Sequence, residues 1–169
     1  MSVRWPSNAL TEVPFEVYSS PAQYALEVER IYKGPAWSYL GLQAALTKSG
    51  DYFTTFIGET SVIVARGEDG TIRGFVNRCA HRGAMLCLEA SGNLERFTCV
   101  YHAWSYDLQG HLMSVAFQHG IKGQGGMPED FALADHRLRE FRVEAYCGLL
   151  FGTFDTATPA LEAYLGDRI

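Results

Sequence analysis

The chain has 169 residues, of which 47% are hydrophobic and 20% are charged, and its formal net charge is −5 at pH 7. This composition fits one globular domain that buries its own core, and it excludes fibrous and intrinsically disordered chains. The acidic balance without a basic cluster argues against nucleic acid as a partner, and no run reaches the roughly 18 apolar residues that a membrane span needs.

The first predicted element is a helix over residues 20–32. Ser20 is placed as its N-cap, Pro21 as its first residue, and Gln23 three positions after the cap. Apolar side chains then recur at helical spacing, at Tyr24, Val28 and Ile31.

From Trp37 onward, short segments rich in β-branched and aromatic residues predict strands. Residues 60–66 and 71–77 are joined by GEDG, which predicts a hairpin. The other predicted strands are residues 51–58, 94–100, 105–115 with a turn at Gln109-Gly110, 138–146 and 148–154. Strands therefore dominate the chain.

Two further segments complete the chain. A short C-terminal helix is predicted with Thr158 as cap, Pro159 as its first residue and Gly166 at its end. The glycine-rich residues 118–131 lack the Gly-Lys-Ser/Thr of a phosphate-binding loop, so we expect a mobile surface loop there.

Cysteine usage depends on the compartment. Residues 1–10 show no apolar run resembling a signal peptide, so we expect a cytoplasmic protein whose thiols stay reduced. The four cysteines are then better interpreted as metal ligands or buried thiols than as disulfides.

Two pairs of metal-binding side chains follow predicted strands. Cys79 and His81 lie in NRCAHRGA (77–84), and after seventeen further residues Cys99 and His102 lie in CVYH (99–102). Each pair falls where a predicted strand ends in a turn. We therefore expect two loop tips that face each other.

Both pairs combine a thiol with an imidazole. Thiolates suit iron bridged by sulfide, and neutral imidazoles leave the other iron easier to reduce, so two of each form the ligand set of a Rieske [2Fe–2S] centre. The four side chains could instead bind one tetrahedral zinc, although zinc sites usually pair like ligands in the sequence. Buried cysteines beside unrelated histidines are a third alternative.

With these motifs the chain resembles the Rieske-type oxygenases, and within them the α (large) subunits of bacterial aromatic-ring-hydroxylating dioxygenases. The resemblance rests on NRCAHRGA (77–84) and CVYHAWSYDLQG (99–110), and it extends to residues 29–41, 50–77 and 138–155. The segment KGQGGMPEDF (122–131) resembles the branch acting on aromatic acids such as salicylate, anthranilate or terephthalate.

The resemblance implies an all-β Rieske fold of small antiparallel sheets, with two cluster-binding loops and short N- and C-terminal helices. It divides the chain into an N-terminal extension with a helix (1–36), the Rieske [2Fe–2S] domain (37–156) and the start of a connection to a catalytic domain (157–169). The cluster ligands would be Cys79, His81, Cys99 and His102, with His102 as the electron-transfer edge.

The implied function is electron transfer within an oxidoreductase. The domain would accept electrons from a ferredoxin or reductase and pass them to a mononuclear non-haem iron that hydroxylates or dihydroxylates an aromatic substrate. Neighbouring α subunits in a trimer, and a small β subunit, would be its further partners. The alternatives are a stand-alone Rieske ferredoxin that carries electrons and a zinc-stabilised interaction module.

The remaining histidines do not match the mononuclear iron site of that family, which uses two histidines and one carboxylate downstream of the Rieske segment. His111 and His119 are eight residues apart, and His136 is farther away. We therefore expect the catalytic half to be missing and this chain alone to be inactive as an oxygenase.

Three residues are expected around the cluster. Trp104 would shield it from water or simply fill the core, and Tyr106 places a phenol near it. Arg82 would stabilise a reduced cluster or bind a partner's carboxylate, unless it is an ordinary solvated arginine. Cys87 and Cys147 fit neither ligand spacing, so we expect buried thiols.

Overall fold

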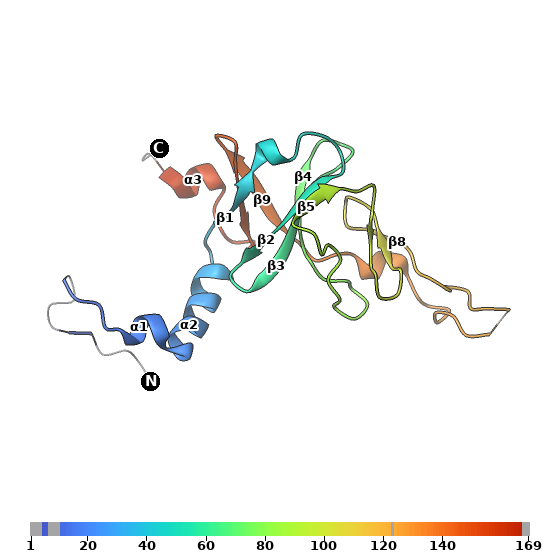
Figure 1. Cartoon of the computed structure of the whole chain (residues 1–169), viewed down its shortest axis with the longest axis horizontal. Coiled ribbons are helices and arrows are strands. Elements are labelled where there is room, and N and C mark those ends of the chain that lie inside the picture. The colour runs from blue at the N-terminus through green and yellow to red at the C-terminus, as the bar shows by residue number, and fades with distance from the viewer. Residues whose placement is uncertain (1–4, 7–10, 123, 167–169) are drawn as a thin grey trace.

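The computed structural model describes residues 5–6, 11–122 and 124–166 (Figure 1). The strands of the larger sheet are β1 (Ser38–Leu42), β2 (Asp51–Ile57), β3 (Thr60–Arg66), β4 (Ile72–Val76), β5 (Ser91–Asn93), β9 (Glu140–Tyr146) and β10 (Leu149–Thr153). Those of the smaller sheet are β6 (Phe97–Thr98), β7 (Ser105–Tyr106) and β8 (Leu112–Ser114). Their orders are β1-β10-β9-β4-β3-β2-β5 and β6-β7-β8, with antiparallel pairing throughout. The all-β fold is confirmed.

The predicted strands differ most from the structure around the second ligand loop. Of residues 94–100, only Phe97 and Thr98 form a strand, although the alternation holds because Phe97 and Cys99 are buried. The strands β1 and β5 were not predicted as separate elements. The backbone of β5 pairs with β2, and its three residues are Ser, Gly and Asn, which carry no strand signal of their own.

Helices lie at both ends of the described chain, as α1 (Glu16–Ser19), α2 (Pro21–Glu27), the π-helical turn η1 (Val28–Tyr32) and α3 (Leu161–Leu165), with 3-10 turns η2 (Gln43–Ala45) and η3 (Leu133–His136). The Ser20 hydroxyl caps α2 by accepting the Gln23 backbone N–H at 3.3 Å, as predicted. Among the described residues, no helix is long and apolar enough to cross a bilayer.

The start of α3 was predicted incorrectly. The helix begins at Leu161 rather than Pro159, and Thr158 is not its cap, because the buried Thr158 hydroxyl pairs with that of Thr153 at 3.0 Å. The carboxylate of Glu144 on β9 instead accepts the Leu161 backbone N–H at 2.7 Å. A residue far away in sequence therefore sets where the helix begins.

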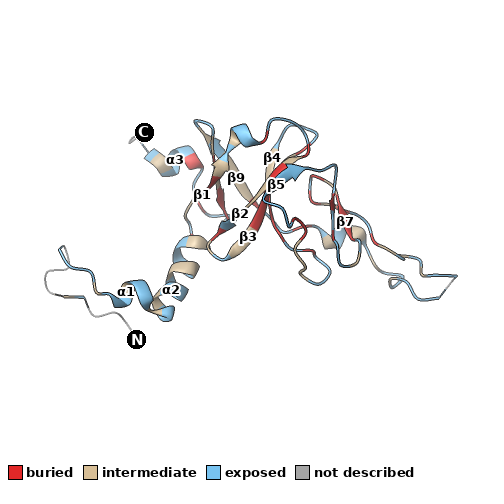
Figure 2. Ribbon diagram, viewed as in Figure 1, coloured by how far each residue is buried: buried red, intermediate tan, exposed pale blue. Residues whose placement is uncertain are grey.

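The interior strand β3 shows how the core is divided. Its residues Val62, Ile63, Val64 and Ala65 are all fully buried. The two valines belong to a cluster formed with β1, β2, β9 and β10, whereas the other two belong to a cluster that continues into the small sheet. Since strand side chains alternate between faces, a continuous apolar run marks a strand covered on both sides. Figure 2 shows this burial along β3.

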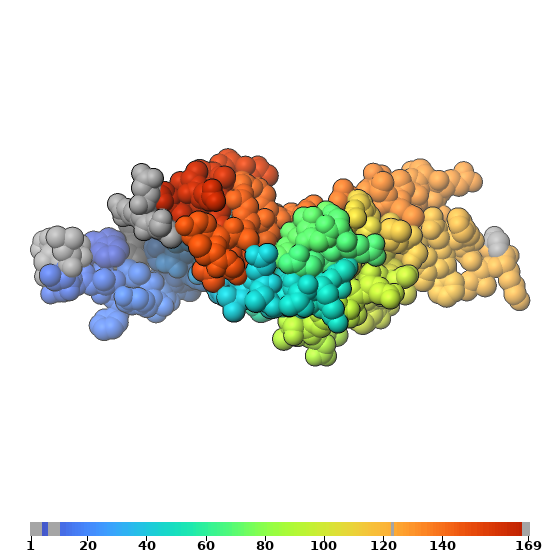
Figure 3. Space-filling model, turned by 90° about the horizontal axis from the view of Figure 1, so that it is seen from above, coloured from blue at the N-terminus to red at the C-terminus, as the bar shows by residue number. Residues whose placement is uncertain are grey.

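The glycine-rich segment forms a narrow hairpin that projects from the small sheet (Figure 1, orange). Ile121 and Gln124 exchange two backbone hydrogen bonds of 3.0 and 3.1 Å, and the Met127 N–H donates to Gln118 at 2.9 Å. A Cβ on Gly126 would lie 2.9 Å from the Gln118 carbonyl oxygen, so the glycine permits the close approach of the two limbs. Figure 3 shows this hairpin and the N-terminal helices at opposite ends of an elongated molecule.

Cys147 is exposed, which corrects the expectation of a buried thiol. It lies with Gly148 in the two-residue turn between β9 and β10, where Tyr146 pairs with Leu149. Both turn residues have positive φ, 48° and 80°. Such a turn matches the right-handed twist of the flanking strands, and the Cys147 side chain is exposed on it.

Candidate metal centre

Two loops that carry the predicted ligands have the same backbone design. In the first, which follows β4, the Cys79 N–H donates to the Ala84 carbonyl at 2.8 Å and the Gly83 N–H to the Cys79 carbonyl at 2.9 Å. In the second, between β6 and β7, the Cys99 N–H donates to the Trp104 carbonyl and the Ala103 N–H to the Cys99 carbonyl, again at 2.8 and 2.9 Å. Each cysteine therefore closes its own loop.

The tightness of each loop requires one residue with left-handed backbone geometry, four positions after the cysteine. It is Gly83 in the first loop, with φ of 72°, and Ala103 in the second, with φ of 54°. Glycine adopts this conformation freely, whereas alanine does so at a cost of about 1–2 kcal/mol. The hydrogen bonds of the second loop offset that strain.

The two loops bring like ligands together. Cys79 and Cys99 are both buried, at 3% and 2% exposure. Burial raises the pKa of the Cys79 thiol, hydrogen bonds from Tyr106 and the His81 backbone N–H lower it, and a side-chain hydrogen bond with Cys99 raises it again. The rings of His81 and His102 meet edge to face, with centroids 4.8 Å apart. Thiol therefore lies beside thiol, and imidazole beside imidazole.

One ring nitrogen of the histidine pair has no partner in the part of the chain that the structure describes. The Nδ1 atom of His102 is buried and has no hydrogen-bond partner among the described residues. A buried polar atom of this kind carries a desolvation cost unless something binds it. No group of three or more His, Cys, Asp or Glu side chains in the described ranges is placed to hold one metal ion. The four residues together offer two neighbouring thiols on one side and two neighbouring imidazoles on the other.

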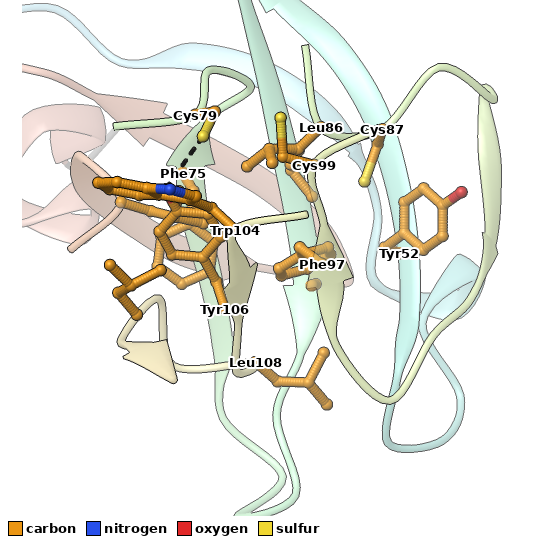
Figure 4. Packing of buried hydrophobic residues seen from close by; sticks show 14 of the residues in the cluster. Tyr52, Phe75, Cys79, Leu86, Cys87, Phe97, Cys99, Trp104, Tyr106 and Leu108 are labelled. Carbon is orange, nitrogen blue, oxygen red and sulfur yellow. Dashed lines mark hydrogen bonds between the residues drawn. The ribbon is translucent and has the colours of Figure 1, made fainter. Parts of the chain in front are cut away.

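Tyr106 links the first ligand loop to the core. Its hydroxyl accepts the Ala80 N–H at 3.0 Å and lies 3.2 Å from the Cys79 sulfur (Figure 4, dashed line). The residue is fully buried, and burial raises the pKa of its phenol. Because the oxygen already accepts one hydrogen bond, its own hydrogen is available for the sulfur.

Trp104 covers one face of His81. Its indole stacks on the His81 ring, and Phe131 and His136 pack edge-on against it, with centroids 5.7 and 5.4 Å away. The Nδ1–H of His136 donates to the Ala132 carbonyl at 3.0 Å, which fixes that ring. Neither Phe131 nor His136 was predicted near the site, since both come from a segment distant in sequence.

His102 carries a second, more exposed stack that joins the loops. The Tyr101 ring lies on His102 with centroids 3.8 Å apart, and the Arg82 guanidinium lies 5.5 Å from the Tyr101 centroid. Arg82 also reaches the Tyr101 hydroxyl at 3.5 Å. Beside this stack, a hollow of about 410 Å³ opens between the second loop and the base of the projecting hairpin at Phe117 and Met127.

Asn77 is a further residue that sequence reasoning missed, although it opens the motif NRCAHRGA. It is fully buried, and its side-chain oxygen accepts the backbone N–H groups of Leu86 and Cys87, each at 3.0 Å. Its amide nitrogen donates to the Cys87 carbonyl at 2.8 Å and to the Ser61 hydroxyl at 3.3 Å. Its position between a predicted strand and the first Cys/His pair was the available signal.

The other cysteines and histidines have separate environments. Cys87 is a buried core thiol, as expected, and burial raises its pKa to about 12. His111 pairs with Asp107 at 2.9 Å. Burial raises the pKa of Asp107, but hydrogen bonds from His111 outweigh it and hold that pKa below its usual value.

Comparison with known proteins adds a family to this geometry. Residues 36–124 match the sequence model of the family described as Rieske [2Fe-2S] domain. The chain is 48% identical over 167 residues to the terephthalate 1,2-dioxygenase terminal oxygenase component subunit alpha 2 of Comamonas sp., and 47% identical over 167 residues to the anthranilate 1,2-dioxygenase large subunit of Burkholderia cepacia. These matches cover 99% of this chain and 40% of each relative.

A solved structure shows the same fold. Naphthalene 1,2-dioxygenase from Rhodococcus sp. bound to indole superposes with a TM-score of 0.83 at 35% sequence identity, covering 95% of this chain and 35% of that one. The chain thus spans about two-fifths or less of the length of these proteins.

Proposed function

The chain belongs to the Rieske [2Fe–2S] domain family, and from this premise we propose that the two loops carrying the Cys/His pairs hold the cluster. Cys79 and Cys99 would bind one iron through their sulfurs, and His81 and His102 the other through ring nitrogens. The observation that carries this assignment is the segregation of the ligands, because the thiols and the imidazoles form separate neighbouring pairs. The unpartnered, buried Nδ1 of His102 supports it.

The residues around the pairs favour electron uptake. A bound [2Fe–2S] cluster accepts and releases one electron at a time. The Tyr106 hydroxyl and the His81 backbone N–H donate to the Cys79 sulfur, and such hydrogen bonds stabilise the more negative, reduced state. Arg82 adds a positive charge at the tip, supporting the same state. We therefore assign Tyr106 and Arg82 to tuning the potential.

The two histidines differ in exposure. His81 is exposed although Trp104 covers one of its faces, whereas His102 is half-buried beneath the exposed Tyr101. We propose that electrons leave through the His102 edge. The adjacent hollow beside Phe117 gives a partner protein room to approach that edge.

We further propose that this domain serves an oxygenase α subunit. It would take electrons from a ferredoxin or reductase and deliver them to a mononuclear non-haem iron that hydroxylates or dihydroxylates an aromatic substrate. The similarity to α subunits named for terephthalate and anthranilate supports an aromatic acid as that substrate. Neighbouring α subunits in a trimer, and a small β subunit, would be the further partners.

The proposal also covers the domain organisation of the chain and its cellular compartment. We propose an N-terminal extension (1–36), the cluster domain (37–156) and the start of a connection to a catalytic domain (157–169). Oxygen activation would depend on that catalytic domain, because His111 pairs with Asp107 and His136 with the Ala132 carbonyl. The four free thiols fit a reducing compartment, and we place the protein in the cytoplasm.

The test begins with the purified chain prepared anaerobically. We expect a brown protein with two irons and two acid-labile sulfides per chain, and an EPR signal after reduction. Cys79→Ser, Cys99→Ser, His81→Ala and His102→Ala should each lose the cluster, and Cys87→Ser and Cys147→Ser should keep it. A colourless protein with one zinc per chain, or bleaching by either control, would refute the assignment.

A second experiment addresses electron transfer. The chain should be reduced by NADH through a suitable reductase and ferredoxin, followed as loss of visible absorbance, and should form no product from terephthalate or anthranilate. Product formation by this chain alone would contradict the proposal that a separate catalytic domain hydroxylates the substrate. Failure of every ferredoxin and reductase to reduce a protein that dithionite reduces would contradict the electron-transfer role.

A further inference from the structure

The two ligand loops are held at their bases in different ways, and we propose that Asn77 is a positioning residue that sets where Cys79 stands relative to the second loop. This inference rests on the proposed cluster function and deepens it. Asn77 touches neither predicted iron ligand pair, and it would act through the backbone of the first loop.

The second loop holds its own base. Its two flanking strands pair directly, Phe97 with Tyr106 and Thr98 with Ser105, and the hydroxyls of Thr98 and Ser105 lie 3.0 Å apart. The loop is therefore the tip of a hairpin. Its cysteine is fixed by the backbone ladder beneath it.

The first loop has no such ladder. The strand β4 enters it at Val76, but residues 77–90 contain no strand, so the returning chain has no backbone partner in β4. The Asn77 side chain supplies the missing bonds. Its oxygen accepts from Leu86 and Cys87, and its nitrogen donates to the Cys87 carbonyl. A side-chain amide has the same donor and acceptor groups as a peptide, so it stands in for a partner strand.

We call the Asn77 amide, with its bonds to Leu86 and Cys87, the clamp. The clamp is rigid because the amide has no free hydrogen-bonding capacity. Besides the three bonds to the returning chain, its nitrogen donates to the Ser61 hydroxyl, and the Asn77 backbone N–H donates to the Ser61 carbonyl at 2.9 Å. The side chain is fully buried. It therefore fixes the first loop to β3, in which Val62, Ile63, Val64 and Ala65 are fully buried, only two residues before Cys79. Any change in the hydrogen bonds of the Asn77 amide would shift the Cys79 sulfur.

Asn77→Asp is the most specific test, because the aspartate side chain has the same shape and size as the asparagine side chain. A carboxylate can still accept from Leu86 and Cys87, but it loses the donor and sets an oxygen against the Cys87 carbonyl. We expect the cluster to form, the EPR spectrum and reduction potential to shift, and loss of iron to a chelator to become about 10-fold faster or more. The amide of Asn93, on β5, donates to Ser49 and Asp51, each at 2.9 Å. Asn93→Asp should lower stability and leave the EPR spectrum and potential unchanged.

Wild-type EPR, potential and iron retention in Asn77→Asp would overturn the proposal, as would equal spectral shifts in Asn93→Asp. If Asn77→Asp does not fold, Asn77→Ser, which adds no charge, is judged by the same measurements. Hydrogen exchange of the wild-type protein is an independent check. Leu86 and Cys87 amides should be as protected as those of β3, and fast exchange would refute the clamp. A wild-type protein without a [2Fe–2S] cluster would instead refute the proposed function.

Discussion

The indole of Trp104 lies flat against the imidazole of His81, with ring centroids 4.7 Å apart and planes inclined by 12°. The stack joins the two loops, since each contributes one ring. It also places the largest buried aromatic surface of the second loop directly on a proposed ligand of the first.

Removing the indole should therefore affect both stability and the cluster. We expect Trp104→Ala to lower the free energy of unfolding by about 3–5 kcal/mol and to uncover the face of His81 on which the indole stacks. Trp104→Phe, which keeps an aromatic ring, should cost less. Urea unfolding gives the first quantity, and bleaching of visible absorbance in a chelator gives the second.

Trp37 provides the control, because it contacts Pro159 and Arg142 far from the loops. Trp37→Ala should lower stability without faster bleaching under native conditions. Equal bleaching in the Trp37 and Trp104 variants would show that the stack does not protect the site.

The left-handed residue of the first loop gives a second prediction. Gly83 has φ of 72°, and a Cβ there would meet nothing within 4 Å, so Gly83→Ala should cost only backbone strain, about 1–2 kcal/mol. Gly83→Asn should cost less, because asparagine tolerates this conformation better. Gly70, with φ of 77° and equally open space, is the matched control in a surface turn.

Chemical denaturation should give similar losses for Gly83→Ala and Gly70→Ala. Only the Gly83 variant should release iron faster, since only its loop carries proposed ligands. A larger cost at Gly70 than at Gly83, or iron loss in both, would contradict this account of the loop.

The thiols should differ in reactivity. Cys147 is exposed in a turn, whereas burial raises the pKa of Cys87 to about 12. At pH 8 only about one Cys87 thiol in ten thousand would then be ionised, and thiolate is the reactive form. Iodoacetamide should label Cys147 alone in the native, cluster-loaded protein, as read by peptide mass spectrometry. Native labelling of Cys87 would disprove its burial.

Asp51 should make stability depend on pH. Hydrogen bonds from the Lys48 backbone N–H and the Asn93 amide lower the pKa of its carboxyl to about 2. A lowered folded-state pKa means that the stabilisation is complete above the unfolded value and is lost as the pH falls from about 4 to about 2. Asp51→Asn should thus be less stable than wild type at pH 6, with the gap narrowing over that acidic range. A gap that is constant with pH would contradict this role.

Much of the fold was readable from local patterns. The hairpin of β3 and β4 followed from two apolar runs around GEDG, and the Ser20 cap followed from its position before Pro21. The spacing of the Cys/His pairs predicted two facing loops because each pair ended a strand. These features depend on residues close together in the sequence, where backbone preference and side-chain alternation act directly.

The tertiary structure decided what depends on distant residues. Glu144 sets the start of α3, and Phe131 and His136 reach Trp104 only after the chain has run through the projecting hairpin. Asn77 becomes a clamp because the returning chain lacks a partner strand, which no local pattern shows. The physical reason is the same throughout. Spacing along the chain determines which side chains can form a ligand set. Which residue satisfies a free hydrogen-bonding group, or packs on an open ring face, depends on what the fold brings beside it.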